Sequence, residues 1–188
     1  MNKYYTHLSA FIDKGAVIGE NTKIWHNAHV MPTAKIGKDC VVAQNCFVAG
    51  VVGNGCKLQN NVNVYEGVIL EDFVFCGPSM TFTNDINPRS KYPKNRKFIE
   101  TRVLKGATLG ANCVVVCGIK IGKWSLVGAG AVVTKNVPNY AIVVGNPAKF
   151  LGWICECGEK LANDFKMIKC KKCGRKYKKD DLKVEEIK

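Results

Sequence analysis

Four cysteines near the C-terminal end have the spacing of metal ligands. Cys155 and Cys157 form a C-x-C-G motif, and after twelve residues Cys170 and Cys173 form a C-x-x-C-G motif. The glycine after each pair suits a tight turn that points backbone amides at thiolates. Two such pairs predict a tetrathiolate zinc site with a structural role, although the first is one residue shorter than the usual C-x-x-C. Four unligated cysteines are the alternative.

Within residues 1–150, the segment between Asn84 and Lys105 carries the largest excess of positive charge. It holds seven Lys or Arg residues against two acidic ones, in a chain whose net charge is +13. Such charge suits phosphate-bearing partners, either nucleic acid or nucleotide-linked small molecules. The Lys-rich tail does not favour nucleic acid, because acidic residues dilute it and its aromatics are few, chiefly Phe165 and Tyr177.

The sequence predicts a cytoplasmic protein with no membrane partner. No apolar run reaches membrane-spanning length, and the N-terminal MNKYYTHLSAF has no apolar core of a signal peptide. Without export signals, the ten cysteines are expected to be reduced thiols rather than disulfides.

The residues that position these groups follow a six-residue period, which is neither helical nor a plain strand alternation. Seventeen of nineteen repeat positions are Ile, Leu or Val. With two interruptions of the register, the positions are Ile12, Ile18, Ile24, Val30, Ile36, Val42, Val48, Val52, Leu58, Val64, Leu70, Cys76, Phe82, Val103, Leu109, Val115, Ile121, Val127 and Val133.

This period predicts an all-β fold, a parallel β-helix in which three short strands make a triangular coil of 18 residues. Coils stack at about 4.8 Å, the usual spacing of strands. A small or β-branched residue follows each repeat position by four, and several cysteines there are expected to act as small apolar side chains. A β-sandwich, the alternative, would not keep this register.

Counting by 18 residues, with the basic segment as an excursion, places four repeat positions on one face: Val64, Phe82, Val115 and Val133. The residues two positions later should then stack in one column, neighbours about 4.8 Å apart. The column is Glu66, Asn84, Cys117 and Lys135. An acid, an amide, a thiol and a cation beside a basic segment predict a functional site, with a solvated polar ridge as the alternative.

The three histidines are poor candidates for a general base at this column. His26 is expected in the first coil, four coils below Asn84, or about 19 Å away. A structural or subunit-interface role is therefore predicted for it. A carbonic-anhydrase-like metal site needs three converging histidines and is not favoured. His26 and His29 are expected on one coil, and His7, the remaining histidine, is not expected at their level.

Four strings carry a resemblance to a known family: KIWHNAHV (23–30), LQNNVNVYEGVILEDFVFCGPSMTFTNDINPRS (58–90), GATLGANCVVVCGIKIGKWSLVGAGAVVTKNVP (106–138) and VGNPAKFLGWICECGEKL (144–161). They resemble the left-handed β-helix acyltransferases, and within these the N-acetyltransferases of UDP-2-acetamido-3-amino-2,3-dideoxy-glucuronate. The resemblance implies a left-handed coil, a homotrimer with sites between subunits, and acetyl-CoA and a nucleotide sugar as substrates in glycan biosynthesis.

The resemblance also implies roles for individual residues. Asn84 would hydrogen-bond the sugar amine, and Glu66 is the candidate helper or base. Arg89 and Arg96 would hold the uronate carboxylate or the UDP phosphates, because a guanidinium binds such groups bidentately. Gln44 is a further candidate for a substrate contact.

Acetyl-CoA is expected along the upper coils, with its pantetheine beside small side chains and its phosphates near lysines. The expected contacts are Ala111, Ala129, Lys135, Pro147 and Lys149.

The predicted organisation is a β-helix acyltransferase domain over residues 1–150, with a loop at 84–102, and a tail over 151–188 that holds a zinc ribbon at 155–173. Two other functions stay open. An O-acetyltransferase of a sugar or serine would need a base to activate a hydroxyl, and no suitably placed histidine exists. A non-catalytic trimeric scaffold would use the zinc ribbon to bind a partner.

Overall fold

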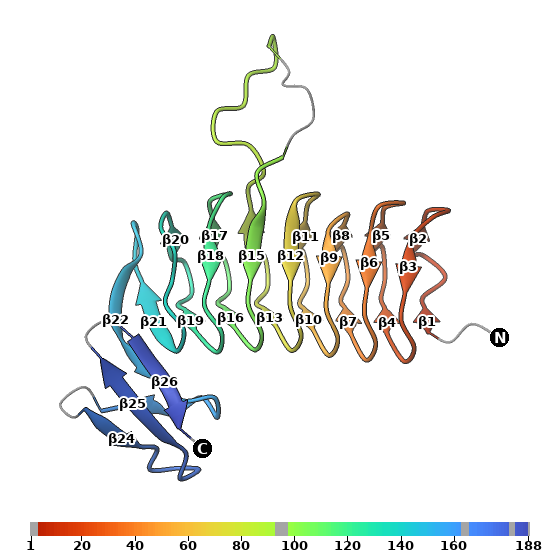
Figure 1. Cartoon of the computed structure of the whole chain (residues 1–188). Coiled ribbons are helices and arrows are strands. Elements are labelled where there is room, and N and C mark those ends of the chain that lie inside the picture. Colours follow the sequence, from red (N-terminus) through yellow and green to blue (C-terminus); the bar gives the residue numbers. More distant parts are fainter. Residues whose placement is uncertain (1–3, 93–97, 163–165, 181–182, 188) are drawn as a thin grey trace.

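The computed structural model describes residues 4–92, 98–162, 166–180 and 183–187, and it confirms the predicted parallel β-helix with a small C-terminal appendage. Strands of two or three residues follow the chain around a triangular prism, and the appendage packs at one end (Figure 1). None of the described residues forms a helix long and apolar enough to cross a bilayer.

Three sheets form the sides of the prism, and their strands are given below in spatial order. Sheet A is β1 (Tyr5–Thr6), β4 (Lys23–Ile24), β7 (Val41–Val42), β10 (Lys57–Leu58), β13 (Phe75–Cys76), β16 (Thr108–Leu109), β19 (Leu126–Val127) and β21 (Ala141–Val144), extended by β22 (Lys149–Ile154) and β23 (Lys160–Leu161). Sheet B is β2 (Phe11–Ile12), β5 (His29–Val30), β8 (Phe47–Val48), β11 (Asn63–Val64), β14 (Thr81–Phe82), β17 (Val114–Val115) and β20 (Val132–Val133). Sheet C is β3 (Val17–Ile18), β6 (Lys35–Ile36), β9 (Val51–Val52), β12 (Val68–Leu70), β15 (Thr101–Val103) and β18 (Lys120–Ile121).

The core is built from the predicted repeat positions, which end the short strands of all three sheets. From Ile24 to Val133 each of them is at most 3% exposed. The small residues before the strands are buried as well, including Cys46 and Cys113. Burial raises the pKa of Cys46 to about 11 and that of Cys113 to about 12, so both thiols are neutral at physiological pH. These cysteines are the small apolar side chains that the repeat predicted.

The corner between sheets A and B has a backbone that suits asparagine. Asn27, Asn45, Asn61 and Asn112 all have φ between 54° and 62°. Asparagine tolerates this left-handed conformation better than most residues do. The coils are joined along the corner, because Asn45 Nδ2 donates to Asn61 Oδ1 at 3.1 Å.

The C-terminal tail is continuous with the β-helix. Strand β22 pairs antiparallel with β21 and crosses the boundary predicted between residues 150 and 151. A separate sheet follows, formed by β24 (Met167–Lys169), β25 (Lys176–Asp180) and β26 (Lys183–Ile187). The ring of Tyr177 in β25 lies 5.2 Å from that of Tyr140 at the end of the β-helix, and both side chains are buried.

Candidate functional site

The predicted column lies at the corner between sheets B and C. Asn63 pairs with Thr81, Phe82 with Val115, and Val115 with Val133, so the strands that precede the column are stacked in the predicted register. The segment between β14 and β15 leaves the prism at this corner (Figure 1). The structure therefore brings the column and the start of the basic segment together.

Hydrogen bonds close the foot of this loop. The Ile99 N–H donates to the carbonyl oxygen of Asn84 at 3.4 Å, which pairs the outgoing and returning chain. Above it, the Cys117 N–H donates to Thr83 Oγ1 at 2.9 Å, and the Gly118 N–H donates to Thr101 Oγ1 at 3.1 Å. Two threonine hydroxyls thus accept from backbone N–H groups of the coil above the loop.

Two glycines make room for the loop foot. Gly67 below it has a φ of 90°, and Gly118 above it has a φ of 84°. A Cβ at Gly67 would lie 3.2 Å from Phe98 Cβ, and one at Gly118 would lie 3.1 Å from Ile99 Cγ2. The returning chain therefore packs between two turns that favour glycine both by conformation and by space.

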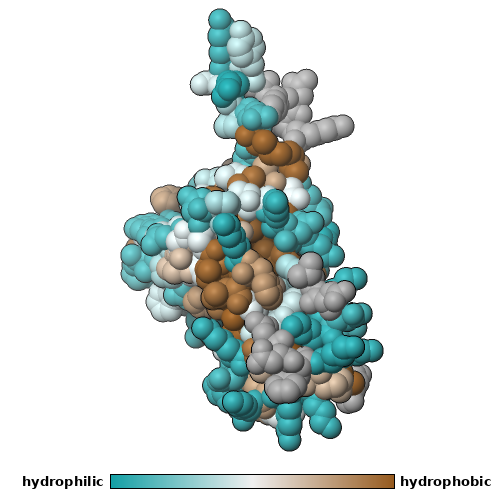
Figure 2. Space-filling model, turned by 90° about the vertical axis from the view of Figure 1, so that its left-hand side faces the viewer, coloured by the Kyte–Doolittle hydropathy of each residue, from teal (hydrophilic) through white to brown (hydrophobic). Residues whose placement is uncertain are grey.

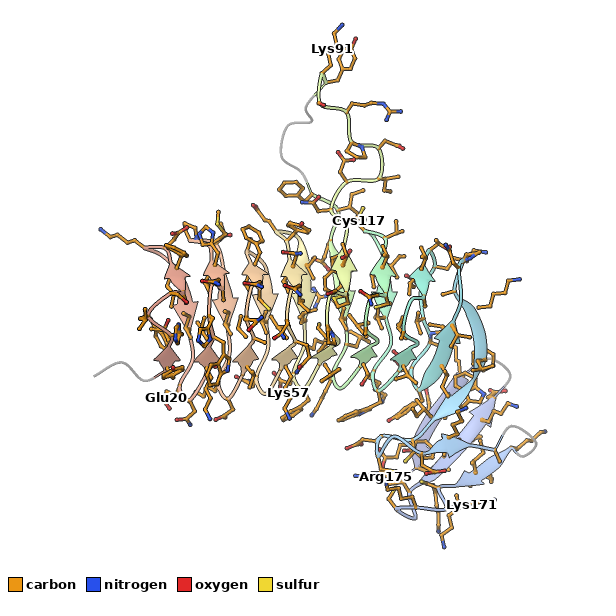
Figure 3. All side chains as sticks on the ribbon, turned by 180° about the vertical axis from the view of Figure 1, so that it is seen from behind. Glu20, Lys57, Lys91, Cys117, Lys171 and Arg175 are labelled. Carbon is orange, nitrogen blue, oxygen red and sulfur yellow. The ribbon has the colours of Figure 1, made fainter. Side chains whose placement is uncertain are left out.

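The loop presents apolar residues at its foot and charged residues farther out. Ile86, Phe98 and Ile99 are exposed apolar side chains, and Figure 2 shows apolar groups at the foot and hydrophilic groups at the tip. Lys91 lies near the tip (Figure 3), and Arg89 is exposed on the same loop. Arg96 lies outside the described residues.

The four members of the column differ in accessibility. Glu66 is exposed and has no hydrogen bond or ion pair with the residues that the structure describes, and Asn84 is half-buried. Cys117 is only 3% exposed and lies at the base of the loop (Figure 3), in the coil that follows that of Asn84. Lys135 is exposed on the rim of a hollow of about 230 Å³ lined also by Ala148, Phe150 and Trp153. Glu66 and Asn84 are thus the polar members that solvent reaches beside the loop foot.

The residues expected to contact CoA lie around the C-terminal end of sheet B. Ala111 and Ala129 stack at the corner between sheets A and B, where the Gly130 N–H donates to the Ala111 carbonyl oxygen at 2.8 Å. The turn holding Pro147 lies beside β20, since the Ala148 N–H donates to the Val132 carbonyl oxygen at 2.8 Å. Lys149 begins β22 directly after this turn, and Lys135 is at the other corner of sheet B.

Gln44 and His26 lie at a different corner from Asn84, the one between sheets A and B. The height predicted for His26 was wrong. Its strand β4 is in the second coil and β14 is in the fifth, so His26 is three coils below Asn84, or about 14 Å along the axis. Its ring stacks on that of His7, with centroids 3.5 Å apart. The described chain therefore brings neither Gln44 nor His26 to Asn84.

A row of aromatic side chains on sheet B was not predicted. Successive ring centroids of Phe11, His29, Phe47 and Tyr65 are 6.2, 5.8 and 5.7 Å apart. His29 Nε2 also lies 3.0 Å from Asp13 Oδ2. Part of the signal was present in the sequence, because Phe11, His29 and Phe47 recur at intervals of 18 and pair in neighbouring strands, but only the inward positions were followed. Tyr65 is not in that register, since Phe47 pairs with Asn63.

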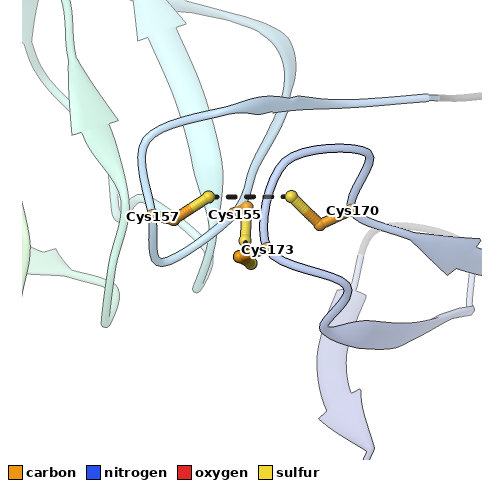
Figure 4. Close-up of side chains that lie close together, drawn as sticks. All are labelled: Cys155, Cys157, Cys170 and Cys173. Carbon is orange, nitrogen blue, oxygen red and sulfur yellow. Dashed lines mark hydrogen bonds between the residues drawn. The ribbon is translucent and has the colours of Figure 1, made fainter.

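The four tail cysteines come together as their spacing predicted. Their sulfur atoms all lie within 4.8 Å of one another, so the cluster could hold a metal ion (Figure 4).

Two family models match the chain. The model described as bacterial transferase hexapeptide (six repeats) matches residues 15–50, and the hexapeptide repeat of succinyl-transferase matches residues 103–135. These segments lie in the β-helix on either side of the loop.

Curated relatives include sugar and serine acetyltransferases. The dTDP-3-amino-3,6-dideoxy-alpha-D-galactopyranose 3-N-acetyltransferase of Aneurinibacillus thermoaerophilus is 41% identical over 184 residues, which cover 97% of this chain and 95% of the relative. Serine acetyltransferase 4 of Arabidopsis thaliana is 34% identical over 128 residues, which cover 68% of this chain but 30% of that protein.

Solved structures share the fold. LpxA, a UDP-N-acetylglucosamine acyltransferase from Bacteroides fragilis, superposes with a TM-score of 0.67 at 19% identity and covers 80% of this chain and 61% of its own. AntD, an N-acyltransferase from Bacillus cereus, superposes with a TM-score of 0.53 at 17% identity over 80% of this chain and 82% of its own. At these identities the likeness concerns the fold alone.

Proposed function

The chain belongs to the hexapeptide-repeat acyltransferase family, and from this premise we propose that it is an acetyl-CoA-dependent N-acetyltransferase of a nucleotide-linked 3-amino sugar. The observation that carries the proposal is the column at the loop foot, where Glu66 and Asn84 lie beside a protruding basic loop. The relative that acts on a 3-amino sugar matches along nearly the whole chain, including the loop.

The identity of the nucleotide and of the sugar in the substrate is a more specific proposal. The resemblance to enzymes of UDP-2-acetamido-3-amino-2,3-dideoxy-glucuronate implied a uronate, whereas the 41% identical relative is named for a dTDP-linked 3-amino-3,6-dideoxy sugar. We take the dTDP-linked 6-deoxy sugar as the first substrate to test and the UDP-linked uronate as the second. Both would offer the same reacting group, a C3 amine.

The reaction needs positioning more than it needs a strong base. A neutral amine attacks a thioester without prior activation, so the enzyme must align the two groups and stabilise the tetrahedral oxyanion. In the proposed mechanism Asn84 holds the amine at the loop foot. The departing CoA thiolate takes up the proton that the amine loses, and Glu66 is the group that can relay it. This chemistry is compatible with a site that lacks a histidine from the same chain.

The remaining substrate groups are assigned to charges around the site. Arg89 would bind a phosphate or carboxylate bidentately, and Arg96 is proposed for the same role. Acetyl-CoA would run past Ala111 and Ala129 toward the turn at Pro147, with Lys135 and Lys149 near its phosphates. Gln44, which lies at another corner, would reach the substrate only from a neighbouring subunit.

A homotrimer explains why the loop points away from its own body. Its exposed apolar foot and the aromatic row on sheet B leave surfaces that a neighbouring subunit would cover. A site between subunits would then combine the loop of one chain with a corner of the next. We propose that the protein acts in the cytoplasm, in the synthesis of activated sugars.

The test is a substrate panel. Purified protein is incubated with acetyl-CoA and dTDP- or UDP-linked 3-amino sugars, and free thiol release and the acetylated product are measured. We expect turnover with a 3-amino sugar and none with serine or the matching 3-hydroxy sugar. Turnover of serine or of the hydroxy sugar would make the protein an O-acetyltransferase. A scaffold would turn over none of them and would not be stabilised by acetyl-CoA in a thermal shift.

A further inference from the structure

The cysteine cluster joins two parts of the chain that share no backbone hydrogen bond among their described residues. Cys155 and Cys157 directly follow β22, which is hydrogen-bonded into sheet A of the β-helix. Cys170 and Cys173 lie between β24 and β25 of the separate three-stranded sheet. Figure 4 shows the two turns facing each other, with their sulfur atoms turned to a common centre.

The sulfur spacing fits a tetrahedral metal site and not disulfides. Zinc–sulfur bonds of about 2.3 Å in a tetrahedron place the sulfurs about 3.8 Å apart. Here Cys155 Sγ lies 3.4 Å from Cys173 Sγ, and Cys157 Sγ lies 3.6 Å from Cys170 Sγ, with all four within 4.8 Å. A disulfide would bring two sulfurs to about 2.05 Å.

Both cysteine pairs sit in tight turns that end in a glycine, and the second turn is one residue longer than the first. The Gly158 N–H donates to the Cys155 carbonyl oxygen at 2.9 Å, and the Gly174 N–H donates to that of Cys170 at 3.0 Å. Gly158 and Gly174 have φ of 87° and 78°, a conformation that strains other residues. Two separate segments thus place a glycine-closed turn around one point, as in paired zinc knuckles.

Polar groups around the cluster are arranged as donors to thiolates. The Tyr177 hydroxyl lies 3.0 Å from Cys155 Sγ, while its oxygen accepts the Glu156 N–H at 3.2 Å, so its proton is free to point at the sulfur. Arg175 Nη1 donates to Cys173 Sγ at 3.4 Å. A four-thiolate zinc site carries net negative charge, and such outer donors stabilise it.

We propose that Cys155, Cys157, Cys170 and Cys173 bind one Zn²⁺ ion that fastens the β24–β26 sheet to the end of the β-helix. Three short strands bury too little apolar surface to be stable alone, so a metal staple supplies what a core cannot. The ion fixes Tyr177 against Tyr140, and β26 then forms one wall of a cleft of about 530 Å³ whose other wall includes Lys120, Asn136 and Asn139. This role is independent of acetyl transfer.

The first experiment measures metal content in the full chain, purified under reducing conditions. The variant is Cys170→Ser/Cys173→Ser. The control is Cys113→Ala, a thiol outside the cluster whose place in the coils above and below is taken by Ala131 and Met80. We expect about one zinc per chain in the native protein and the control, and a loss of at least tenfold in the variant. No bound metal, iron in place of zinc, or zinc retained by the variant would each overturn the proposal.

The second experiment tests the staple without a substitution that could prevent folding. The native chain is stripped with a chelator, digested briefly with trypsin, and compared with the same sample after zinc is restored. Cleavage at the lysines of 166–187 should accelerate on removal of zinc and return on its addition, while the β-helix stays resistant. Equal cleavage in both samples would show that the ion does not hold this sheet. Neither readout depends on which substrate the enzyme acetylates.

Discussion

The backbone N–H of Cys117 donates a 2.9 Å hydrogen bond to the hydroxyl of Thr83, although the two residues are 34 positions apart. Paired residues of neighbouring coils elsewhere in sheet B are 16 or 18 positions apart, as between Val48 and Val64 or Val115 and Val133. The extra length is the loop that leaves after Asn84, and this bond closes its foot. The geometry of the candidate site therefore depends on a contact that spans the loop.

Replacing Thr83 by valine should destabilise the loop foot. The Cys117 N–H would lose its acceptor at a partly buried position, which costs about 1–3 kcal/mol. We expect a lower melting temperature and reduced turnover. Thr81→Val is the matched control, because the Thr81 side chain has no hydrogen-bond partner in the described part of the chain. Equal melting temperatures and rates for the two variants would refute the role given to Thr83.

Asn84→Ala should lower turnover about 10²–10³-fold while leaving acetyl-CoA binding nearly unchanged, since one contact to a developing charge is lost. The measurement is the steady-state rate beside calorimetric binding of acetyl-CoA. His26→Ala should leave the chemical step intact, because its coil is remote from Asn84. If His26→Ala abolished activity in a folded protein while Asn84→Ala did not, the proposed mechanism would be wrong.

Arg89→Ala should raise the KM for the nucleotide sugar with little change in kcat. The guanidinium is proposed to bind a charge that is present in both the ground and the transition state, so its loss weakens uniform binding. Lys57→Ala removes the same charge from the outer face of sheet A and serves as the control (Figure 3). A fall in kcat at constant KM would instead place Arg89 at the reacting atoms.

The protein should sediment as a trimer. The loop extends away from its own prism, and its apolar foot is exposed in one chain. Sedimentation velocity and activity are measured over the same range of dilution, and activity is expected to fall as the assembly dissociates. A monomer that keeps full activity would rule out sites between subunits.

Gly110→Ala should destabilise the upper coils. Its Cβ would lie 2.5 Å from the Ala129 amide nitrogen, too close without a shift of the backbone. The cost is about 1–3 kcal/mol, as for other overpacked sites. Gly130→Ala is the control, because nothing lies within 4 Å of its Cβ and only its φ of 68° is unfavourable. Thermal unfolding should show the larger loss for Gly110→Ala.

The one-dimensional order of the β-helix is what made the site column predictable. Each coil contacts only its neighbours, so a count of 18 residues places Val115 below Val133 without knowledge of anything else. The count failed where it had to assign whole coils. The count placed Ile24 at the end of the first coil and Phe82 at the start of the fifth, so that His26 was predicted four coils below Asn84. The structure has only three coils between them.

By itself the sequence determined the all-β repeat, the register across the loop and the grouping of four cysteines, because each follows from local spacing. Only the tertiary structure decided that Cys117 is buried at the base of the loop and that Thr83 and Thr101 close the loop's foot. These depend on how the outgoing and returning chain pack against the coils above and below. Such contacts join residues far apart in the sequence and leave no periodic signal.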